Sequence, residues 1–364
     1  MRRTVVIGVL LWGAASSAPA GGTATRFEFS EVHMGVPVKI ALYTAEVEAA
    51  NRAAKAVYAR FAELNRIMSD YDPGSELSRL SRLSPHDKPV AVSEPLGFVL
   101  DRSQQLAEQT GGAFDVTVGP MVRLWRRARR NGELPSADRI QEAKAAVGFE
   151  QMKLDGARRA VRLMKPKMQL DLGGIAMGYA VDEGLKILRQ RGITSAMIDA
   201  SGDIGVGDPP PKNRGWRIGI VPLKPDAPPS RYLLLANAAV TTSGDTFQFV
   251  EIGGKRYSHI VDPKTGYGLT DHCSVTIVAP DCITADSLAT AVSVLGPKAG
   301  LEFVERQPNV AALILRGSDN TPEVYESARW KNLLFEGKSK IPNLKSQTNS
   351  KHECSKPQAT PRRT

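Results

Sequence analysis

Residues 167–200 read KMQLDLGGIAMGYAVDEGLKILRQRGITSAMIDA, and they give the clearest indication of the fold class. The first six residues predict a β-strand, and apolar residues at helical spacing predict a helix from about residue 176 to 191. A second strand is expected at TSAMIDA, which ends at residue 200. Strands that alternate with single helices, joined by a glycine turn, indicate a domain that combines both elements.

Further strands and helices are expected on both sides of this stretch. Alternating apolar residues in FEFSEVHMGVPVKIALYT predict a hairpin around Met34 and Gly35. Helices are expected over residues 45–69, 94–110 and 137–147, after Pro120, and at ADSLATAVSVLG. Strands are expected at WRIGIVP, RYLLLANAAVTTS, FQFVEIGG, KRYSHIVD, SVTIVAP and AALILR. Hairpins mixed with helices favour an α+β domain with mixed antiparallel sheets over a doubly wound parallel sheet.

The composition excludes several classes of protein. Of the 364 residues, 42% are hydrophobic and 24% are charged, as in ordinary globular domains, which excludes wholesale disorder and a multi-span membrane protein. The formal net charge is +10, but Arg2 and Arg3 supply +2 and residues 338–364 supply +6, which leaves +2 for the rest. A nearly neutral body does not predict a nucleic-acid-binding protein.

The two ends of the chain are expected to lie outside the folded domain, which is placed at residues 24–336. Two arginines and the apolar run TVVIGVLLWGAA precede the small-residue site APA, the layout of a secretory signal peptide over residues 1–20. An exported, periplasmic protein is therefore expected, and no cysteine near the site offers a lipid anchor. The polar, basic residues 337–364 predict a disordered tail that can associate with an anionic membrane or protein.

The three cysteines do not define a site. Cys273, Cys282 and Cys354 are too few for a disulfide scaffold, and the absence of a CxxC motif or a Cys/His cluster argues against zinc. Cys273 and Cys282 flank the strand expected at SVTIVAP. Whether they pair stays open at this point, because their distance in space decides it.

The glycine turn after Asp171 is the first candidate for a ligand site. In DLGGIAMG, residues 171–178, the glycines let the backbone approach a ligand, and free N–H groups at the helix start favour a phosphate. The alternative is a tight, closely packed turn that binds no ligand, which would need the same glycines. The spacing fits neither a P-loop nor the dinucleotide-binding fingerprint, which argues against those two classes.

Asp286 and Thr290 are candidate metal ligands. They lie at positions i and i+4 of one expected helix, so their oxygens face the same way. A carboxylate and a hydroxyl suit a hard cation such as Mg²⁺. The alternative is that Asp286 complements the helix dipole and Thr290 bonds back to a carbonyl group.

Three further features could carry chemistry or be structural. His259, near the end of a strand in YSHIVDPKTG, could be a general base for a hydroxyl or a structural histidine. The loop GAFDVT at residues 112–117 could grip a heteroaromatic ligand, or stop a helix with a core phenylalanine. The arginines at positions 123, 126, 127, 129 and 130 are interpreted as a solvated helix face, since only Trp125 accompanies them as an aromatic platform.

Taken in their order along the chain, these segments resemble the ApbE family of FAD:protein FMN transferases over roughly residues 27–316. The resemblance rests on MGVPVKIALY, MSDYDPGSELSRL, TGGAFDVTVGP, LDLGGIAMGYAVD, SGDIGVGD, TTSGD, YSHIVDPKTG and TADSLATAVSVLG. It implies an α+β fold with a T-fold-like duplication. It also implies that FAD and Mg²⁺ are bound, and that FMN is transferred to a Thr or Ser hydroxyl of an exported or membrane flavoprotein while AMP leaves.

The resemblance implies site residues by position. Contacts to FAD are implied for Met34, Tyr71, Ala113, Phe114, Asp115, Asp171 and Ile260. Ligands of Mg²⁺ are implied at Asp286, Thr290 and the backbone carbonyl of Gly174, and His259 falls at the family's histidine near the reacting phosphate, as the base. Met177 stands where relatives commonly carry Lys or Glu, so a charged contact to FAD is expected to be missing there, with an effect on affinity or nucleotide preference.

Two alternatives to the transferase stay open on the sequence. An FAD pyrophosphatase would use the same FAD and Mg²⁺ site, but water would replace the protein hydroxyl and release FMN and AMP. A periplasmic FAD-binding protein would hold the nucleotide without turnover. No motif in the sequence identifies the acceptor protein.

Overall fold

The computed structural model describes residues 24–220, 222–224, 227–229, 231–245, 248–317 and 321–336. The signal peptide predicted at residues 1–20 and the tail predicted at 337–364 lie outside the described residues. Across the described ranges, no helix is both long and apolar enough to cross a membrane.

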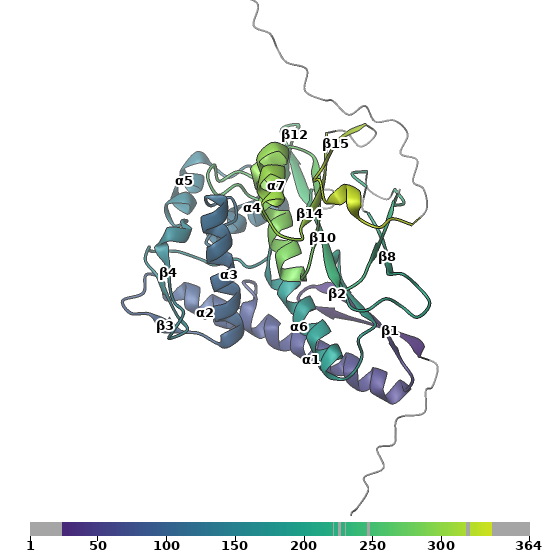
Figure 1. Ribbon diagram of the computed structural model, residues 1–364. Helices are drawn as coiled ribbons and strands as arrows, with labels where there is room; N and C mark the ends of the chain where they lie inside the picture. Colours follow the sequence, from purple (N-terminus) through teal and green to yellow (C-terminus); the bar gives the residue numbers. More distant parts are fainter. Residues whose placement is uncertain are drawn as a thin grey trace, which may run out of the picture.

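An eight-stranded sheet forms the centre of the fold (Figure 1). Its spatial order is β1 (Thr25–His33), β2 (Val36–Thr44), β6 (Ala196–Ala200), β7 (Asp203–Val206), β10 (Ala238–Gly244), β13 (Cys273–Ala279), β14 (Ala311–Gly317) and β15 (Pro322–Glu326). Every neighbouring pair is antiparallel, which confirms the expectation of antiparallel sheets. The hairpin around Met34 and Gly35 is confirmed as well: both residues have positive φ, as a tight two-residue turn requires.

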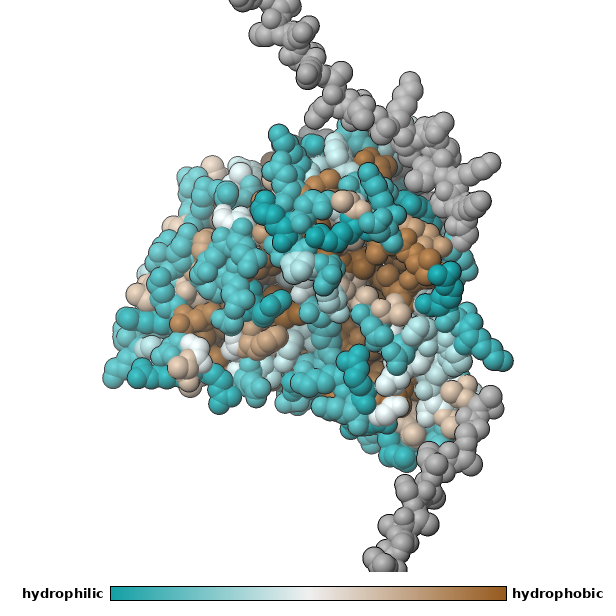
Figure 2. Space-filling model, viewed as in Figure 1, coloured by the Kyte–Doolittle hydropathy of each residue, from teal (hydrophilic) through white to brown (hydrophobic). Residues whose placement is uncertain are grey.

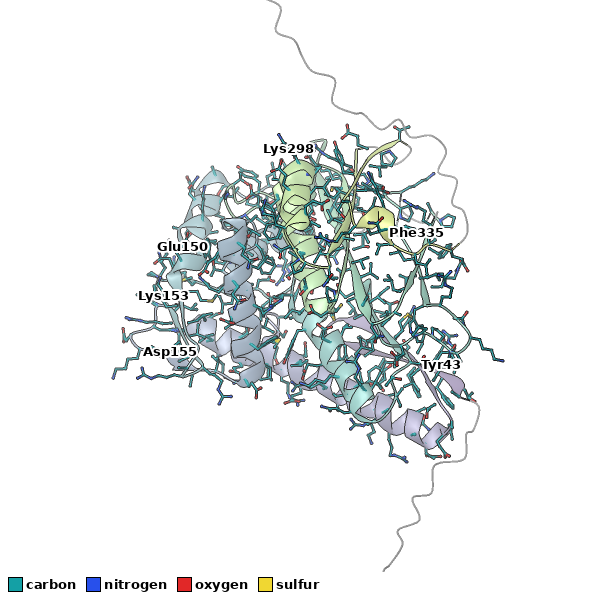
Figure 3. The ribbon with its side chains drawn as sticks, in the orientation of Figure 1. Tyr43, Glu150, Lys153, Asp155, Lys298 and Phe335 are labelled. Atoms are coloured by element: carbon teal, nitrogen blue, oxygen red, sulfur yellow. The ribbon has the colours of Figure 1, made fainter. Side chains whose placement is uncertain are left out.

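Side chains alternate between the two faces of this sheet, and apolar residues on each face pack against other elements. One face packs against α1 (Val47–Met68), α6 (Ala176–Gln190) and α7 (Cys282–Glu305), and Ile40, Ile277 and Phe61 belong to the larger core cluster there. The other face packs against the hairpin of β8 (Trp216–Gly219) and β9 (Tyr232–Leu235). Hydrophobic residues gather around β8 and β14 in Figure 2, and Tyr43 and Phe335, labelled in Figure 3, flank this second cluster.

The remaining elements lie mostly beside the large sheet. The helices there are α2 (Glu76–Arg82), α3 (Glu94–Thr110), α4 (Gly119–Asn131) and α5 (Ala137–Ala145). A small sheet has the order β3 (Val90–Ala91), β5 (Ala160–Leu163) and β4 (Met152–Asp155), and a separate hairpin pairs β11 (Phe249–Ile252) with β12 (Lys255–Ser258). Short 3₁₀ turns are η1 (Phe149–Gln151) and η2 (Trp330–Asn332). The Trp125 side chain joins α4 to the region after β12, because its indole N–H donates to the Gly266 carbonyl at 2.8 Å.

Two expected strands are corrected by the structure. Residues 167–172 do not form a strand beyond one bridge between Gln169 and Val118, because their N–H groups bond to loops and side chains instead: Leu170 donates to the Ser81 hydroxyl. The single strand expected at RYLLLANAAVTTS is two strands in different sheets, β9 and β10. The chain turns between them at Asn237, whose φ is 48°.

The helix expected at ADSLATAVSVLG is confirmed as the first part of α7. Gly296 has a φ of 76° and is followed by Pro297, so the helical hydrogen bonding is interrupted where that expected helix ends. Cys273 begins β13 and Cys282 begins α7, and both are free thiols rather than a disulfide. Burial raises the pKa of the Cys273 thiol to about 12, so it stays protonated at neutral pH.

Replacement of Gly178 by alanine should destabilise the fold by about 1–3 kcal/mol, the usual range for overpacking a core. A Cβ at this position of α6 would overlap the backbone carbonyl of Cys282, so α6 and α7 would have to separate. Gly156→Ala is the matched control, since its added Cβ meets nothing within 4 Å. Urea unfolding of the two variants measures the difference, and equal midpoints would contradict the close helix contact.

Candidate active site

The Asp171 turn links the two loops that the sequence singled out. The N–H group of Asp171 donates to the Val116 carbonyl at 2.8 Å, which fastens the turn to the loop at residues 112–117. The Asp171 carboxylate accepts a hydrogen bond from the Gly173 N–H at 2.8 Å, which shapes the turn before α6. The backbone of the glycine turn is therefore fixed from both sides without a ligand.

Asp286, Thr290 and the turn that contains Gly174 lie close to one another where α6 begins beside α7. A Cβ on Gly174 would lie 2.7 Å from the Thr290 hydroxyl oxygen, so only glycine lets the turn approach this side chain so closely. Oδ2 of Asp286 accepts a hydrogen bond from the Gly178 N–H at 3.0 Å. The Asp286 side chain is buried, with 4% of the residue exposed. The i and i+4 placement of Asp286 and Thr290 on one helix is confirmed.

Carboxyl groups gather around Asp286. Burial is the largest cause that raises the pKa of this carboxyl group, and the charges of Asp203 and Asp182 raise it further. Burial also raises the pKa of Asp182 and of Asp203 to about 7 each. Asp182 accepts hydrogen bonds from the N–H groups of Cys282 and Ile283, both at 2.8 Å, and so fixes the start of α7. A cation bound to Asp286 would offset both the cost of burying the charged carboxylate and its repulsion by Asp203 and Asp182.

The donor set at this junction fits Mg²⁺. Carboxylate, hydroxyl and carbonyl oxygens are the hard ligands that Mg²⁺ prefers, and Mg²⁺ commonly completes its shell with water or phosphate. In the part of the chain that the structure describes, no group of three His, Cys, Asp or Glu side chains could hold a metal. The donors at the junction are oxygens, which differ from the cysteine and histidine ligands of a structural zinc site.

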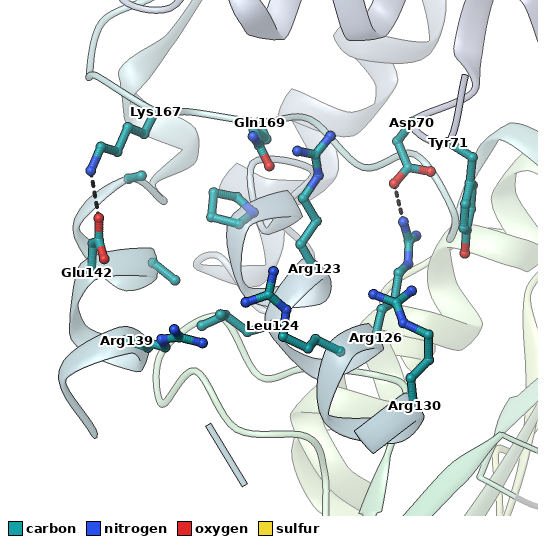
Figure 4. Close-up of a pocket in the computed structure, with 14 residues that line it drawn as sticks. Asp70, Tyr71, Arg123, Leu124, Arg126, Arg130, Arg139, Glu142, Lys167 and Gln169 are labelled. Carbon is teal, nitrogen blue, oxygen red and sulfur yellow. Dashed lines mark hydrogen bonds and ion pairs between the residues drawn. The ribbon is translucent and has the colours of Figure 1, made fainter. Parts of the chain in front are cut away.

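Arg126 is a site residue that the sequence reasoning missed. The sequence pattern predicts a solvated helix face here, but the Arg126 side chain is only 16% exposed. It pairs with Asp70 (Figure 4) and also with Asp171. The bond to the Asp171 carboxylate is 2.8 Å long. The guanidinium also lies 4.1 Å from the centre of the Tyr71 ring. A signal was available in the sequence, because Met121, Trp125 and Ala128 mark the buried face of this helix and Arg126 borders it.

Replacement of Arg126 by methionine should leave two carboxylates without their shared cation. We expect a loss of about 2 kcal/mol in the free energy of unfolding, less than the 3–5 kcal/mol of a fully buried pair, because the three side chains are 8–16% exposed. Arg127→Met is the matched control, since Arg127 is an exposed neighbour on the same helix. Thermal melts of both variants measure the difference; a stable Arg126→Met variant would contradict the bridging role.

His259 lies directly after β12, near the end of a strand as expected. Its Nδ1 is 3.1 Å from the Gln248 carbonyl oxygen, which can only accept, so Nδ1 carries the proton and Nε2 keeps a free lone pair. Burial is the main cause that lowers the pKa of His259 to about 4, and the charges of Arg129 and Arg126 lower it as well. The imidazole is therefore neutral at physiological pH, and the charges of Arg129 and Arg126 act on it.

The other expected FAD contacts take different positions. Tyr71 is 73% exposed and offers a ring for stacking. Phe114 and Ala113 are buried, and Phe114 belongs to the larger core cluster, so its ring packs inside the fold. The Asp115 carboxylate accepts hydrogen bonds from the N–H and hydroxyl of Thr117 at 2.8 and 2.7 Å and from the Phe149 N–H at 3.0 Å. These bonds fix the loop, and burial raises the pKa of Asp115.

Some of the expected FAD contacts do not touch Arg126 or its partners Asp70, Tyr71 and Asp171. Met34 stands at the β1–β2 turn and packs against the larger core cluster, as does Met177 in the first turn of α6. Ile260 is buried beside His259. The contacts given above join the turn at Asp171 to the loop at residues 112–117 and to the first half of α7.

Comparison with known proteins identifies the family. The model of the ApbE family matches residues 34–314. The FAD:protein FMN transferase of Haemophilus influenzae is 34% identical over 280 residues, which cover 74% of this chain and 80% of that protein. The FAD:protein FMN transferase of Treponema pallidum is 32% identical over 327 residues, which cover 85% of this chain and 90% of that protein.

Solved structures confirm the fold class expected from the resemblance. The flavin transferase ApbE from Vibrio cholerae superposes with a TM-score of 0.76 at 30% identity, covering 85% of this chain and all of that one. The ApbE protein from Thermotoga maritima gives a TM-score of 0.75 at 29% identity, covering 85% and 99%. The chain belongs to the ApbE family of FAD:protein FMN transferases.

Proposed function

We propose that the chain transfers FMN from FAD to a Thr or Ser hydroxyl of an exported or membrane flavoprotein, in a Mg²⁺-dependent reaction that releases AMP. Family membership supports flavin transfer. The observation that carries the rest is the junction of α6 and α7, where Asp286 and Thr290 lie against the Asp171 glycine turn. This junction combines oxygen donors for a cation with backbone that can approach a phosphate.

Asp286, Thr290 and the Gly174 carbonyl would hold Mg²⁺, which supplies charge neutralisation at the pyrophosphate and polarises the phosphorus that carries riboflavin. Gly174 lets the turn lie against the Thr290 side chain, so the backbone of the turn would stand beside the bound cation and the pyrophosphate. Tyr71 would stack on a flavin or adenine ring. Arg126 holds the Tyr71 ring and the Asp171 carboxylate in place. The chain's own residues would thus position FAD at the junction.

His259 would remove the proton from the acceptor hydroxyl. As the hydroxyl oxygen forms its bond to the FMN phosphorus, the bond between that phosphorus and the AMP phosphate oxygen breaks, and AMP carries away the electron pair. The proton passes to Nε2, because Nδ1 already donates to the Gln248 carbonyl. The phosphates of FAD would raise the pKa of His259 from about 4, since nearby negative charge favours the imidazolium.

A transfer assay tests this proposal and separates its alternatives. The purified chain is incubated with FAD, Mg²⁺ and a recombinant flavin-carrying domain, and the acceptor is examined for covalent FMN fluorescence while AMP is quantified. Covalent FMN with one AMP per transfer is the expected result. Free FMN and AMP with an unmodified acceptor would identify a pyrophosphatase instead, and FAD binding without AMP would identify a protein that binds without turnover.

Export rests on the sequence alone, because residues 1–20 lie outside the described residues. We propose cleavage after Ala20 and a periplasmic mature protein, with the basic residues 337–364 available for contact with an anionic surface. Mass spectrometry of the protein recovered from the periplasmic fraction gives its first residue. A cytoplasmic protein that keeps its first 20 residues would contradict the proposal.

A further inference from the structure

A basic groove lies beside the Tyr71–Arg126 cluster, between α4, α5 and the segment before Asp171 (Figure 4). Its volume is about 630 Å³, and Asp70, Tyr71 and Arg126 form one end of its lining. Arg126 pairs with Asp171, and Asp70 and Tyr71 both contact Arg126. The groove therefore starts at the candidate active site and extends away from it along α4.

Four arginines that line this groove have no ion-pair partner among the described residues, although the charge of Arg123 acts on Asp171 and that of Arg139 acts on Glu142. Two cations of the lining are paired: Arg126 with Asp70, and Lys167 with Glu142 at 2.6 Å. Within the described residues, four further guanidinium groups of the lining make no hydrogen bond or ion pair; they belong to Arg123, Arg127, Arg130 and Arg139. Arginines with free planar donors match carboxylate and phosphate oxygens in a bidentate manner.

FAD alone does not account for this charge. Of the residues implied to contact FAD, only Tyr71 lines the groove, whereas Asp171, the loop at 113–115 and Ile260 do not. The pyrophosphate of FAD would be neutralised at the α6–α7 junction. A second anionic ligand would account for four unpaired arginines on one concave surface.

The position of the groove favours a protein segment over a membrane. A bilayer is flat and meets protruding side chains, whereas these arginines line a hollow whose inner end is the candidate active site. The only macromolecule that the proposed reaction brings to this place is the acceptor, whose hydroxyl must reach the FMN phosphorus. Apolar contacts from Pro120 and Leu124 in the same lining suit a peptide chain as well.

We propose that this groove docks an acidic segment of the acceptor protein next to its Thr or Ser attachment site, an inference that rests on the proposed function. Carboxylates of that segment pair with the free arginines of α4 and α5, and the pairing steers the acceptor hydroxyl toward His259. Charge complementarity of this kind raises the rate and specificity of association more than it changes the chemical step.

A binding experiment tests the groove independently of catalysis. A fluorescently labelled octaglutamate peptide is titrated with the wild-type chain, with R127E/R130E, and with the control R52E/K55E, which makes the same charge change on exposed residues of α1. We expect affinity at low salt to fall about tenfold or more in R127E/R130E alone, and to fall with added salt. Saturating FAD should leave peptide binding intact.

Three outcomes of this experiment would overturn the inference. Equal loss in both double variants would show that only net charge matters. Displacement of the peptide by FAD or AMP would assign the groove to the nucleotide. Arginine-dependent binding to phosphatidylglycerol vesicles, without binding to octaglutamate, would assign it to a membrane.

The transfer assay adds the functional measurement. With an acceptor domain that the wild type labels, R127E/R130E should raise KM for the acceptor about tenfold while kcat and KM for FAD stay unchanged. R127Q/R130Q should show a smaller rise, and thermal melts should confirm that both variants fold. An unchanged KM for the acceptor would overturn the docking role. A wild type that labels no acceptor would instead contradict the proposed function, whereas peptide binding would still report on the groove.

Discussion

Asp286→Asn should reduce kcat for FMN transfer by roughly three orders of magnitude, the several kcal/mol that a bound metal contributes to stabilising a phosphoryl transition state. Asparagine keeps an oxygen that can accept the Gly178 N–H, so the contact between α6 and α7 survives. It removes the negative charge that a divalent cation needs. The measurement is single-turnover transfer at saturating FAD over a range of Mg²⁺ concentrations.

The same substitution should not unfold the protein. Asp286 is buried, and the charges of Asp203 and Asp182 raise its pKa, so in the absence of metal its carboxylate is repelled rather than paired. In EDTA the Asn variant should therefore melt at or above the temperature of the wild type. Added Mg²⁺ should raise the Tm of the wild type by linkage and leave the variant unchanged.

Asp138→Asn is the matched control, because Asp138 is an exposed carboxylate in the first turn of α5. It should keep both the activity and the Mg²⁺-dependent rise in Tm. Retained transfer by Asp286→Asn at ordinary Mg²⁺ concentrations would remove this residue from the metal site. A wild type whose Tm does not respond to Mg²⁺ would contradict the metal assignment itself.

Local patterns predicted the elements that carry strong periodicity. The β1–β2 hairpin, α1, α3 and the paired positions of Asp286 and Thr290 follow from apolar spacing and from glycine at the turn. The strand β7 was missed because its sequence, DIGV, is short and contains Gly205. A Cβ on Gly205 would meet the Val181 and Leu185 side chains at 2.7 and 2.8 Å, so this strand depends on packing against α6.

The pattern of its own helix places Arg126 at the border of the buried face, but it does not identify the partners of this side chain. In the sequence it is one of several basic residues, and only the fold brings Asp70 and Asp171, which lie 56 and 45 positions away, to its guanidinium. Its exposed neighbours Arg127 and Arg130 match the solvated face that was expected. The distinction between a buried bridging arginine and an exposed one depends on tertiary contacts, which local periodicity does not contain.

Replacement of His259 by glutamine should lower kcat by about 10²–10⁴-fold, the usual contribution of a positioned general base. FAD binding should change little, because the hydrogen bond that the structure gives this side chain goes to the Gln248 carbonyl. His33→Gln is the matched control: it removes a histidine from the end of β1, where its ring stacks on Tyr58. Equal kcat for the two variants would contradict the role of His259 as base.

The pH dependence gives a second measurement of the same group. A base must be unprotonated, and burial together with Arg129 and Arg126 lowers the pKa of His259 from the ordinary 6.5 to about 4. The acid limb of kcat/KM, which reports the free enzyme, should therefore fall only as the pH approaches 4 rather than near 6.5. Arg129→Gln removes one of the cations that lower this pKa, so its acid limb should shift to higher pH. An acid limb that does not move would contradict the electrostatic contact.

The lowered pKa also links His259 to folding. Because the unfolded chain binds this proton near pH 6.5 and the folded chain only near pH 4, the contribution of His259 to stability is complete above pH 6.5 and is lost as the pH falls toward 4. Between these values, His259→Gln should lose less stability on acidification than the wild type. A variant that is slower in transfer but less sensitive to acid would show that the burial which keeps the imidazole neutral for catalysis also carries a cost in acid stability.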